Sequence, residues 1–178
     1  MSGPIETEVK LKIASVEAAH EALDRIGARA TRARHIEDNL LFDLEGKVLR
    51  ARGHLLRLRE TPSGAVLTFK GPYRVEDGIK SREEIEAGSA DGSALRAILN
   101  RLGFAPVFRY QKYRETFAWQ GQEIVVDETP IGIFLEIEGD PAGIHAAANA
   151  LGFGPTDYLT DSYAALFRAA GGTGDMLF

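Results

Sequence analysis

The chain has 178 residues, of which 44% are hydrophobic and 26% charged, and its formal net charge is -5. This length fits one domain with a substantial core, and the acidic balance argues against a general nucleic-acid-binding protein. Cysteine is absent, which excludes disulfides and thiolate catalysis. With no apolar run of about 18 residues and no signal-peptide pattern, we expect a cytoplasmic protein that does not enter membranes.

Taken in chain order, alternating stretches predict a fold made mostly of strands, with helices between them. The expected strands span residues 5–13, 29–43, 55–61, 65–71, 79–87, 105–119, 122–128 and 133–139. The expected helices are 18–26, the segment between a cap at Asp91 and a stop at Gly103, 141–151 and 160–170. Residues 75–78 are expected to form a loop. We expect one domain over 1–170 and a glycine-rich tail at 171–178.

The first strand, "IETEVKLKI", carries an apolar row and a charged row. Glu6, Glu8, Lys10 and Lys12 share one parity, and Ile5 to Ile13 supply the other. Side chains at i and i+2 lie on one face of a strand, so the carboxylates and the ammonium groups occupy the same face. Five later segments repeat this division: "LLRLRE", "VLTFKG", "IKSREEIE", "YQKYRE" and "IFLEIEG".

These charged rows predict a closed barrel and not an open sheet. Ordinary solvated faces mix Thr, Ser and Gln with scattered charges, whereas here paired Arg, Lys and Glu dominate. If the helices cover the apolar faces, the charged faces point inward, and buried charges need partners of both signs. We therefore expect an α+β fold: an eight-stranded antiparallel tunnel with a charged interior and helices packed outside.

The inward charges suit a polyanion held together with metal. Arg forks and Lys ammonium groups bind phosphate oxygens, and clustered carboxylates without Cys favour Mg²⁺ or Mn²⁺. The basic candidates are Lys10, Lys12, Arg57, Arg59, Lys70, Lys80, Arg82, Lys112 and Arg114. The acidic candidates are Glu6, Glu8, Glu84, Glu86, Asp127, Glu136 and Glu138. A triphosphate bridged to divalent cations would satisfy both sets at once.

In this order, the motifs resemble the CYTH superfamily, the triphosphate tunnel metalloenzymes. The series begins at Glu6-x-Glu8-x-Lys10 and continues through "LTFKGP", "SREEIE", "QKYRE" and "GIFLEIEG" to "TDSYAALF". The resemblance implies metal ligation by Glu6, Glu8, Asp127, Glu136 and Glu138. It implies triphosphate binding by Lys10, Lys12, Arg57, Arg59, Lys70, Arg82, Lys112 and Arg114. Glu84 and Glu86 would support the basic groups or touch metal.

Within the family, this ordered set of motifs is most similar to the class IV adenylate cyclase-like branch. That resemblance implies conversion of ATP to cyclic AMP and pyrophosphate. The alternative is a triphosphatase acting on tripolyphosphate, a nucleoside triphosphate or thiamine triphosphate. A non-catalytic polyphosphate-binding module is a third reading, but it would gain nothing from seven inward carboxylates without metal. The sequence leaves cyclase and triphosphatase open, because the same charged rows serve both reactions.

Three further features complete the expectations. The second strand departs from many relatives, because "EDNLLFD" places Glu37, Asn39 and Leu41 where they carry Gln, Asp and Tyr. This departure puts any nucleotide contact from that strand in doubt. No base pocket is evident, and Phe42, Tyr73 and Phe134 are expected to pack in the core more often than to stack on a base. The apolar end, residues 176–178, either docks on a partner in a homodimer or frays.

Overall fold

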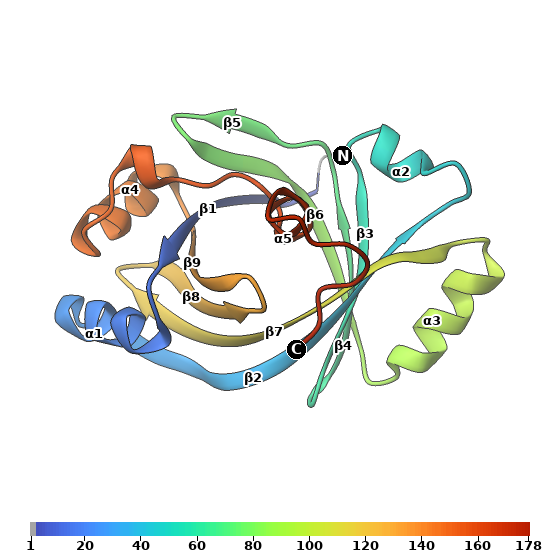
Figure 1. Ribbon diagram of the computed structural model, residues 1–178, viewed down its shortest axis with the longest axis horizontal. Helices are drawn as coiled ribbons and strands as arrows, with labels where there is room; N and C mark the ends of the chain where they lie inside the picture. Colours follow the sequence, from blue (N-terminus) through green and yellow to red (C-terminus); the bar gives the residue numbers. More distant parts are fainter. Residues whose placement is uncertain (1–2) are drawn as a thin grey trace.

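A computed structural model describes residues 3–178, and within them eight strands close into an antiparallel barrel. The ring runs β1-β9-β8-β7-β2-β3-β4-β6 and closes where β6 pairs with β1, as Figure 1 shows. The expected closed eight-stranded tunnel, with helices outside it, is therefore confirmed. No helix among residues 3–178 is both long and apolar enough to cross a bilayer.

The strands and helices lie close to where the sequence predicts them. The strands are β1 (Ile5–Ile13), β2 (Arg29–Asp43), β3 (Leu55–Thr61), β4 (Gly64–Lys70), β5 (Arg74–Glu76), β6 (Ile79–Ser89), β7 (Ala105–Trp119), β8 (Gln122–Thr129) and β9 (Gly132–Glu138). The helices are α1 (Val16–Ile26), α2 (Val48–Ala51), α3 (Gly92–Arg101), α4 (Pro141–Ala150) and α5 (Tyr163–Ala169), with a short 3₁₀ turn at Pro155–Asp157.

Three local expectations are wrong. The segment expected to be a loop at 75–78 begins inside strand β5, which pairs with β6 outside the ring; only 77–78 form a turn. Helix α2 was missed because four residues are too few to show a helical period. Helix α5 begins at Tyr163 and not near 160, because Ser162 is its cap: the Ser162 hydroxyl accepts a hydrogen bond from the Ala165 N–H.

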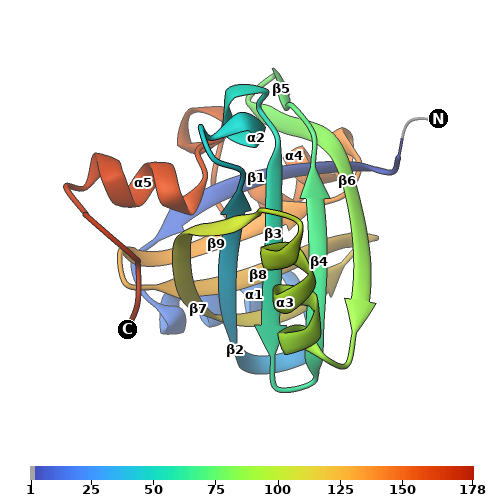
Figure 2. The same ribbon diagram turned by 90° about the vertical axis from the view of Figure 1, so that its right-hand side faces the viewer.

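The outward faces of the strands form two separate cores beneath the helices. Helices α1 and α4 cover β1, β8 and β9 on one side of the barrel, where Leu11, Ile124 and Ile137 are fully buried. Helix α3 covers β3 and β4 on the other side, as Figure 2 shows, and its buried Leu99 joins Leu58 of β3 in the second core. The apolar side chains of each strand therefore pack outward, against the helices. The side chains at the alternate positions of each strand face the tunnel.

The C-terminal segment lies against the barrel. Met176 is fully buried, its N–H donates to the Arg109 carbonyl, and its own carbonyl accepts from the Gln111 N–H. Phe178 packs on Tyr113 with ring centroids 5.2 Å apart. The expected tail, residues 171–178, thus pairs with β7 at Tyr110, on the stretch of β7 that β8 leaves unpaired.

The second core gives a direct test of this packing. Leu58 is fully buried under α3, so Leu58→Ala removes its packing and leaves a cavity. We expect its free energy of unfolding to fall by about 2–5 kcal/mol in urea denaturation. Ile98→Ala, on the exposed side of the same helix, should change it by less than about 0.5 kcal/mol. Equal losses in the two variants would contradict the assignment of the faces.

Candidate functional site

The tunnel contains nearly all of the charged residues that the sequence singles out. A central cavity of about 70 Å³ is lined by side chains of seven strands. Its charged lining residues are Glu6, Glu8, Lys10, Arg57, Arg59, Lys70, Lys80, Arg82, Lys112, Arg114, Glu136 and Glu138. A wider mouth of about 750 Å³ opens beside it and shares Glu6, Arg57, Arg59, Arg114 and Glu138. Charges from strands far apart in sequence thus meet in one space.

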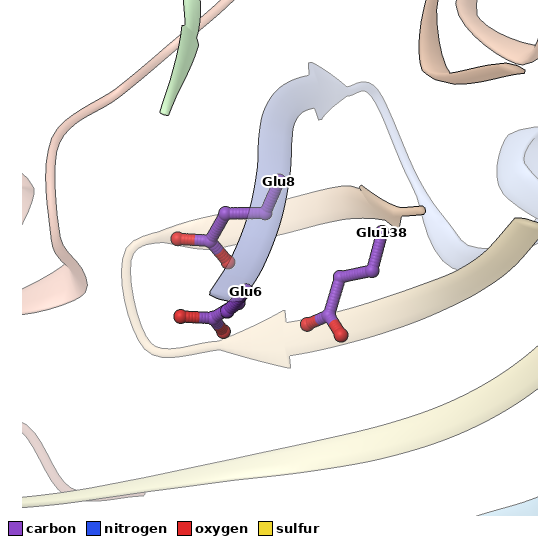
Figure 3. Close-up of side chains that lie close together, drawn as sticks. All are labelled: Glu6, Glu8 and Glu138. Carbon is purple, nitrogen blue, oxygen red and sulfur yellow. The ribbon is translucent and has the colours of Figure 1, made fainter. Parts of the chain in front are cut away.

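Three carboxylates at the edge of the central cavity form a compact group. Glu6 and Glu8 come from β1, Glu138 comes from β9, and one oxygen from each lies within 4.8 Å of the others. Figure 3 shows the three side chains pointing toward one another. Glu8 and Glu138 are direct cross-strand partners, and Glu6 follows on the same face. Oxygen-only ligands at this spacing fit a hard divalent cation such as Mg²⁺ or Mn²⁺.

The electrostatics of this group favour a cation. Burial, together with the nearby carboxylates of Glu136, Glu6 and Glu8, raises the pKa of Glu138 to about 8, against the effect of Arg114. Glu6 behaves differently: burial raises its pKa, but Lys70, Glu84 and Arg82 together outweigh burial and lower the pKa to about 2. Glu6 and Glu8 each form an ion pair with a basic side chain, whereas Glu138 forms none among residues 3–178; a bound metal ion would supply positive charge beside it.

Asp127 and Glu136 lie apart from the three-carboxylate group, among cations. The Asp127 carboxylate, fully buried, accepts hydrogen bonds from Lys112 Nζ at 2.7 Å and from Arg114 Nε and Nη2 at 2.7 and 2.6 Å. Glu136 pairs with Lys10 at 2.6 Å and with Arg114 at 2.5 Å. Burial raises the pKa of Glu136, but Lys10, Lys112 and Arg114 together outweigh burial and hold the pKa well below its usual range. These contacts suit orientation of the cations better than metal ligation.

The basic side chains nearest the three carboxylates form ion pairs with Glu6 and Glu8. Lys70 Nζ lies 2.7 Å from Glu6 Oε1, and Arg82 Nε lies 3.3 Å from Glu6 Oε2. Lys80 forms an ion pair with Glu8. A metal ion bound to the carboxylates would compete with these pairs and leave the basic groups free to meet phosphate oxygens.

The remaining predicted residues divide between the mouth and the surface. Glu84 and Glu86 line the wider mouth, where Arg57 Nη2 lies 3.6 and 3.5 Å from their carboxylates. Burial raises the pKa of Glu84 to about 7, although Lys70 opposes it. Lys12 is exposed and does not line the cavity. Its cross-strand partner Phe134 packs edge-on against Tyr163, with centroids 5.4 Å apart, so aromatic rings end the charged interior before Lys12.

Three residues of the tunnel were not predicted as part of the site. Glu37 is fully buried, with its oxygens 3.4 Å from Arg59 and 3.5 Å from Lys112. Burial opposes its ionisation, but Lys112 and the Arg groups hold the pKa of Glu37 well below its usual range. Tyr110 lines the central cavity; burial raises its pKa, yet Arg57 and other cations lower it overall. Glu37, Asn39 and Leu41 are alternate residues of β2, so their side chains lie on the same face of the strand. This alternation was the sequence signal for a polar face of β2 toward the tunnel.

Tyr163, on α5, is the third of these residues and reaches into the cavity from outside the barrel. Its hydroxyl donates to Asp127 at 2.7 Å, and Lys10 Nζ and Lys112 Nζ lie 4.6 and 5.2 Å from its ring centroid. Burial and the charge of Asp127 raise the pKa of Tyr163 well above its usual value. Both ammonium groups therefore lie close to a neutral aromatic ring that comes from a helix, which no pattern within a single strand could indicate.

The raised pKa of Glu138 predicts a pH-dependent stability. In the absence of metal its carboxyl titrates near 4.5 when unfolded and at about 8 when folded, so its contribution to stability is lost as the pH rises between these values. Glu138→Gln should therefore raise Tm relative to wild type above pH 8, with chelator present. The gain should shrink as the pH falls toward 4.5. Tm of both proteins is measured by thermal unfolding at several pH values across this range. The same rise in Tm at every pH would contradict the raised pKa of Glu138.

Comparisons with known proteins agree with the geometry. The CYTH domain family model matches residues 4–152. A Methanocaldococcus jannaschii protein named "putative adenylate cyclase" is 32% identical over 135 residues, covering 75% of this chain and 76% of its own. A Vibrio parahaemolyticus structure of the same description has a TM-score of 0.80 at 19% identity, covering 93% and 99% of the two chains. A Hippeastrum structure described as a "putative adenylyl cyclase" with dominant triphosphatase activity has a TM-score of 0.68 at 20% identity, covering 94% and 97%. The chain belongs to the CYTH domain family.

Proposed function

We propose that this protein is a metal-dependent enzyme that processes a triphosphate bound inside its tunnel. One observation carries the proposal: basic side chains from five strands face the same small cavity as a three-carboxylate group. A site of either sign alone would bind only an anion or only a cation. A triphosphate with a divalent metal ion supplies both partners and neutralises both sets of buried charge.

Glu6, Glu8 and Glu138 would hold Mg²⁺ or Mn²⁺. The bound ion would neutralise phosphate charge and make an attacking oxygen more nucleophilic. Glu136 and Asp127 keep Lys10, Lys112 and Arg114 in place through the short contacts described above. Phosphoryl chemistry depends mainly on positioning and charge stabilisation, which such preorganised cations provide.

Arg57, Arg59 and Arg114 would grip the phosphate chain by their guanidinium forks, with the lysines adding point charge. Glu37 lies behind Arg59 and Lys112 with its carboxylate oxygens otherwise without hydrogen-bond partners among the described residues. Its negative charge would keep these two cations ordered in the absence of substrate. The tunnel then binds a triphosphate without having to assemble its cations first.

Cyclisation of ATP to cyclic AMP and pyrophosphate is the first candidate reaction. It requires the ribose 3′ oxygen to attack the α-phosphorus, and the M. jannaschii relative carries a cyclase name. Hydrolysis of the terminal phosphate is the second candidate. It is favoured by the wide mouth, because Glu6 and Glu138 line both this opening and the central cavity, so water can approach the carboxylate group.

One incubation series separates these reactions. ATP, tripolyphosphate and thiamine triphosphate are each offered with Mg²⁺ or Mn²⁺, and the products are identified by chromatography. Cyclic AMP with pyrophosphate selects the cyclase, and orthophosphate selects the triphosphatase. No turnover of any of the three, with binding that persists in chelator, would overturn the proposal and indicate a binding module.

Replacement of Glu8 tests the metal role. Glu8→Gln keeps the size of the side chain but removes one charge from the carboxylate group, so metal-dependent turnover should fall by at least about 100-fold. Circular dichroism should show an unchanged fold. Glu21→Gln, an exposed change on α1, is the matched control and should keep full activity. Full activity in Glu8→Gln would contradict metal ligation by this residue.

Replacement of Arg59 tests the direction in which the charged rows face. Arg59→Ala should weaken tripolyphosphate binding, measured by calorimetry, by about 10-fold to 100-fold, because a charged hydrogen-bond donor is lost in a buried site. Arg29→Ala, at the exposed start of β2, should change it less than about twofold. Similar small changes in tripolyphosphate affinity in both variants would indicate that the face of β3 carrying Arg59 points into solvent.

A further inference from the structure

Strand β5 is a free edge of the sheet, because β6 is the only strand that pairs with it among residues 3–178. All three of its residues, Arg74, Val75 and Glu76, are exposed. The chain returns from β5 into β6 through Asp77 and Gly78, whose φ angles of 50° and 79° are both positive, as a type I′ turn requires. The free edge therefore belongs to a tight hairpin, which lies at the top of Figure 1.

The backbone of Val75 faces outward from this edge. A two-residue hairpin turn closes with a hydrogen-bonded pair of flanking residues, which here are Glu76 and Ile79. Hydrogen-bonded and non-hydrogen-bonded pairs alternate along an antiparallel ladder, so the N–H and the carbonyl of Val75 point away from β6. Both groups can therefore bond to another strand without breaking any bond between β5 and β6.

The order of the side chains on β5 suits pairing with a second copy of the same strand. Charged residues on an edge strand usually prevent such pairing, because like charges would meet. An antiparallel pair centred on Val75 instead places Arg74 of each copy opposite Glu76 of the other, so opposite charges meet twice. A two-fold axis at Val75 produces these contacts, and it also lets each Val75 N–H donate to the Val75 carbonyl of the other copy.

Apolar side chains around the edge would extend the contact. Tyr73 and Ile5 are 59% and 61% exposed, and Ile5 lines a surface hollow of about 420 Å³ together with Arg74 and Glu76. Ile85 of β6 is also exposed. A stable interface buries about 800 Å² on each partner, which is more than a ladder of three residues supplies, so apolar surface of this kind is needed beside it.

We propose that two copies of this chain associate through their β5 edges as a two-fold symmetric dimer. The pairing would join the sheets of the two barrels across the axis. Strand β6 is the next strand of this sheet and carries Lys80 and Arg82 into the central cavity, so the interface would lie one strand away from the cationic lining of each tunnel. The dimer requires neither metal nor triphosphate, so it can form even where the proposed enzyme activity is absent.

Charge reversal on β5 tests the dimer. The mass in solution and the dissociation constant are measured by analytical ultracentrifugation for wild type, Arg74→Glu, Glu76→Arg and the control Arg25→Glu on α1. All three residues are exposed, so circular dichroism should show an unchanged fold. Wild type and the control should have twice the mass of one chain at roughly 100 μM, where a micromolar dimer is mostly formed. Each β5 variant brings like charges together twice and should raise the dissociation constant at least about 10-fold.

Mixing the two β5 variants gives the sharper test. Arg74→Glu and Glu76→Arg carry edges of opposite charge, so an equimolar mixture should form a heterodimer about as tight as the wild-type dimer. The double variant Arg74→Glu/Glu76→Arg has one charge of each sign again and should also dimerise like wild type. A monomeric wild type at this concentration, a dissociation constant that neither single reversal raises, or a mixture that stays monomeric would each overturn the inference.

Discussion

The structure depends on the mutual neutralisation of charges buried inside the barrel. Lys112 and Arg114 enclose Asp127, Lys10 pairs with Glu136, and Lys70 with Glu6, all at 2.6 to 2.8 Å. An isolated charge in such an interior would cost several kcal/mol, so each pair is tolerated only because the opposite sign faces it from another strand. Breaking one pair would leave a buried charge without its partner, so the pairs hold the basic side chains in defined positions within the tunnel.

Closure of the ring uses the same interaction. Strands β1 and β6 meet with Glu6 opposite Arg82 and Glu8 opposite Lys80, so the seam of the barrel is itself a row of ion pairs. Two of the three carboxylates that fit a metal ion therefore also hold the closing strands together. A cation bound there, with phosphate beside it, would replace ion pairs within the protein by ion pairs with the ligand. The barrel shape and the binding chemistry are two consequences of the same charge pattern.

The alternation of charged and apolar residues along each strand was sufficient to predict the closed barrel and the inward position of most charged side chains. It could not predict which charges pair, because pairing depends on register between strands far apart in sequence. Asp127 and Glu136 were expected to bind metal, yet register places both among cations. Lys12 has the expected parity but lies past the aromatic pair Phe134 and Tyr163. Tyr163 enters from helix α5, so no pattern within a strand could reveal that its hydroxyl meets Asp127.

The central claim is that the tunnel exchanges its internal ion pairs for a triphosphate and a divalent metal ion. The most direct measurement is a crystal structure with Mn²⁺ and tripolyphosphate, with the metal located by its anomalous scattering. The account predicts a manganese peak among Glu6, Glu8 and Glu138, with phosphate oxygens on Arg57, Arg59 and Arg114. Manganese bound elsewhere, or tripolyphosphate seated outside the tunnel while the internal pairs stay intact, would contradict it.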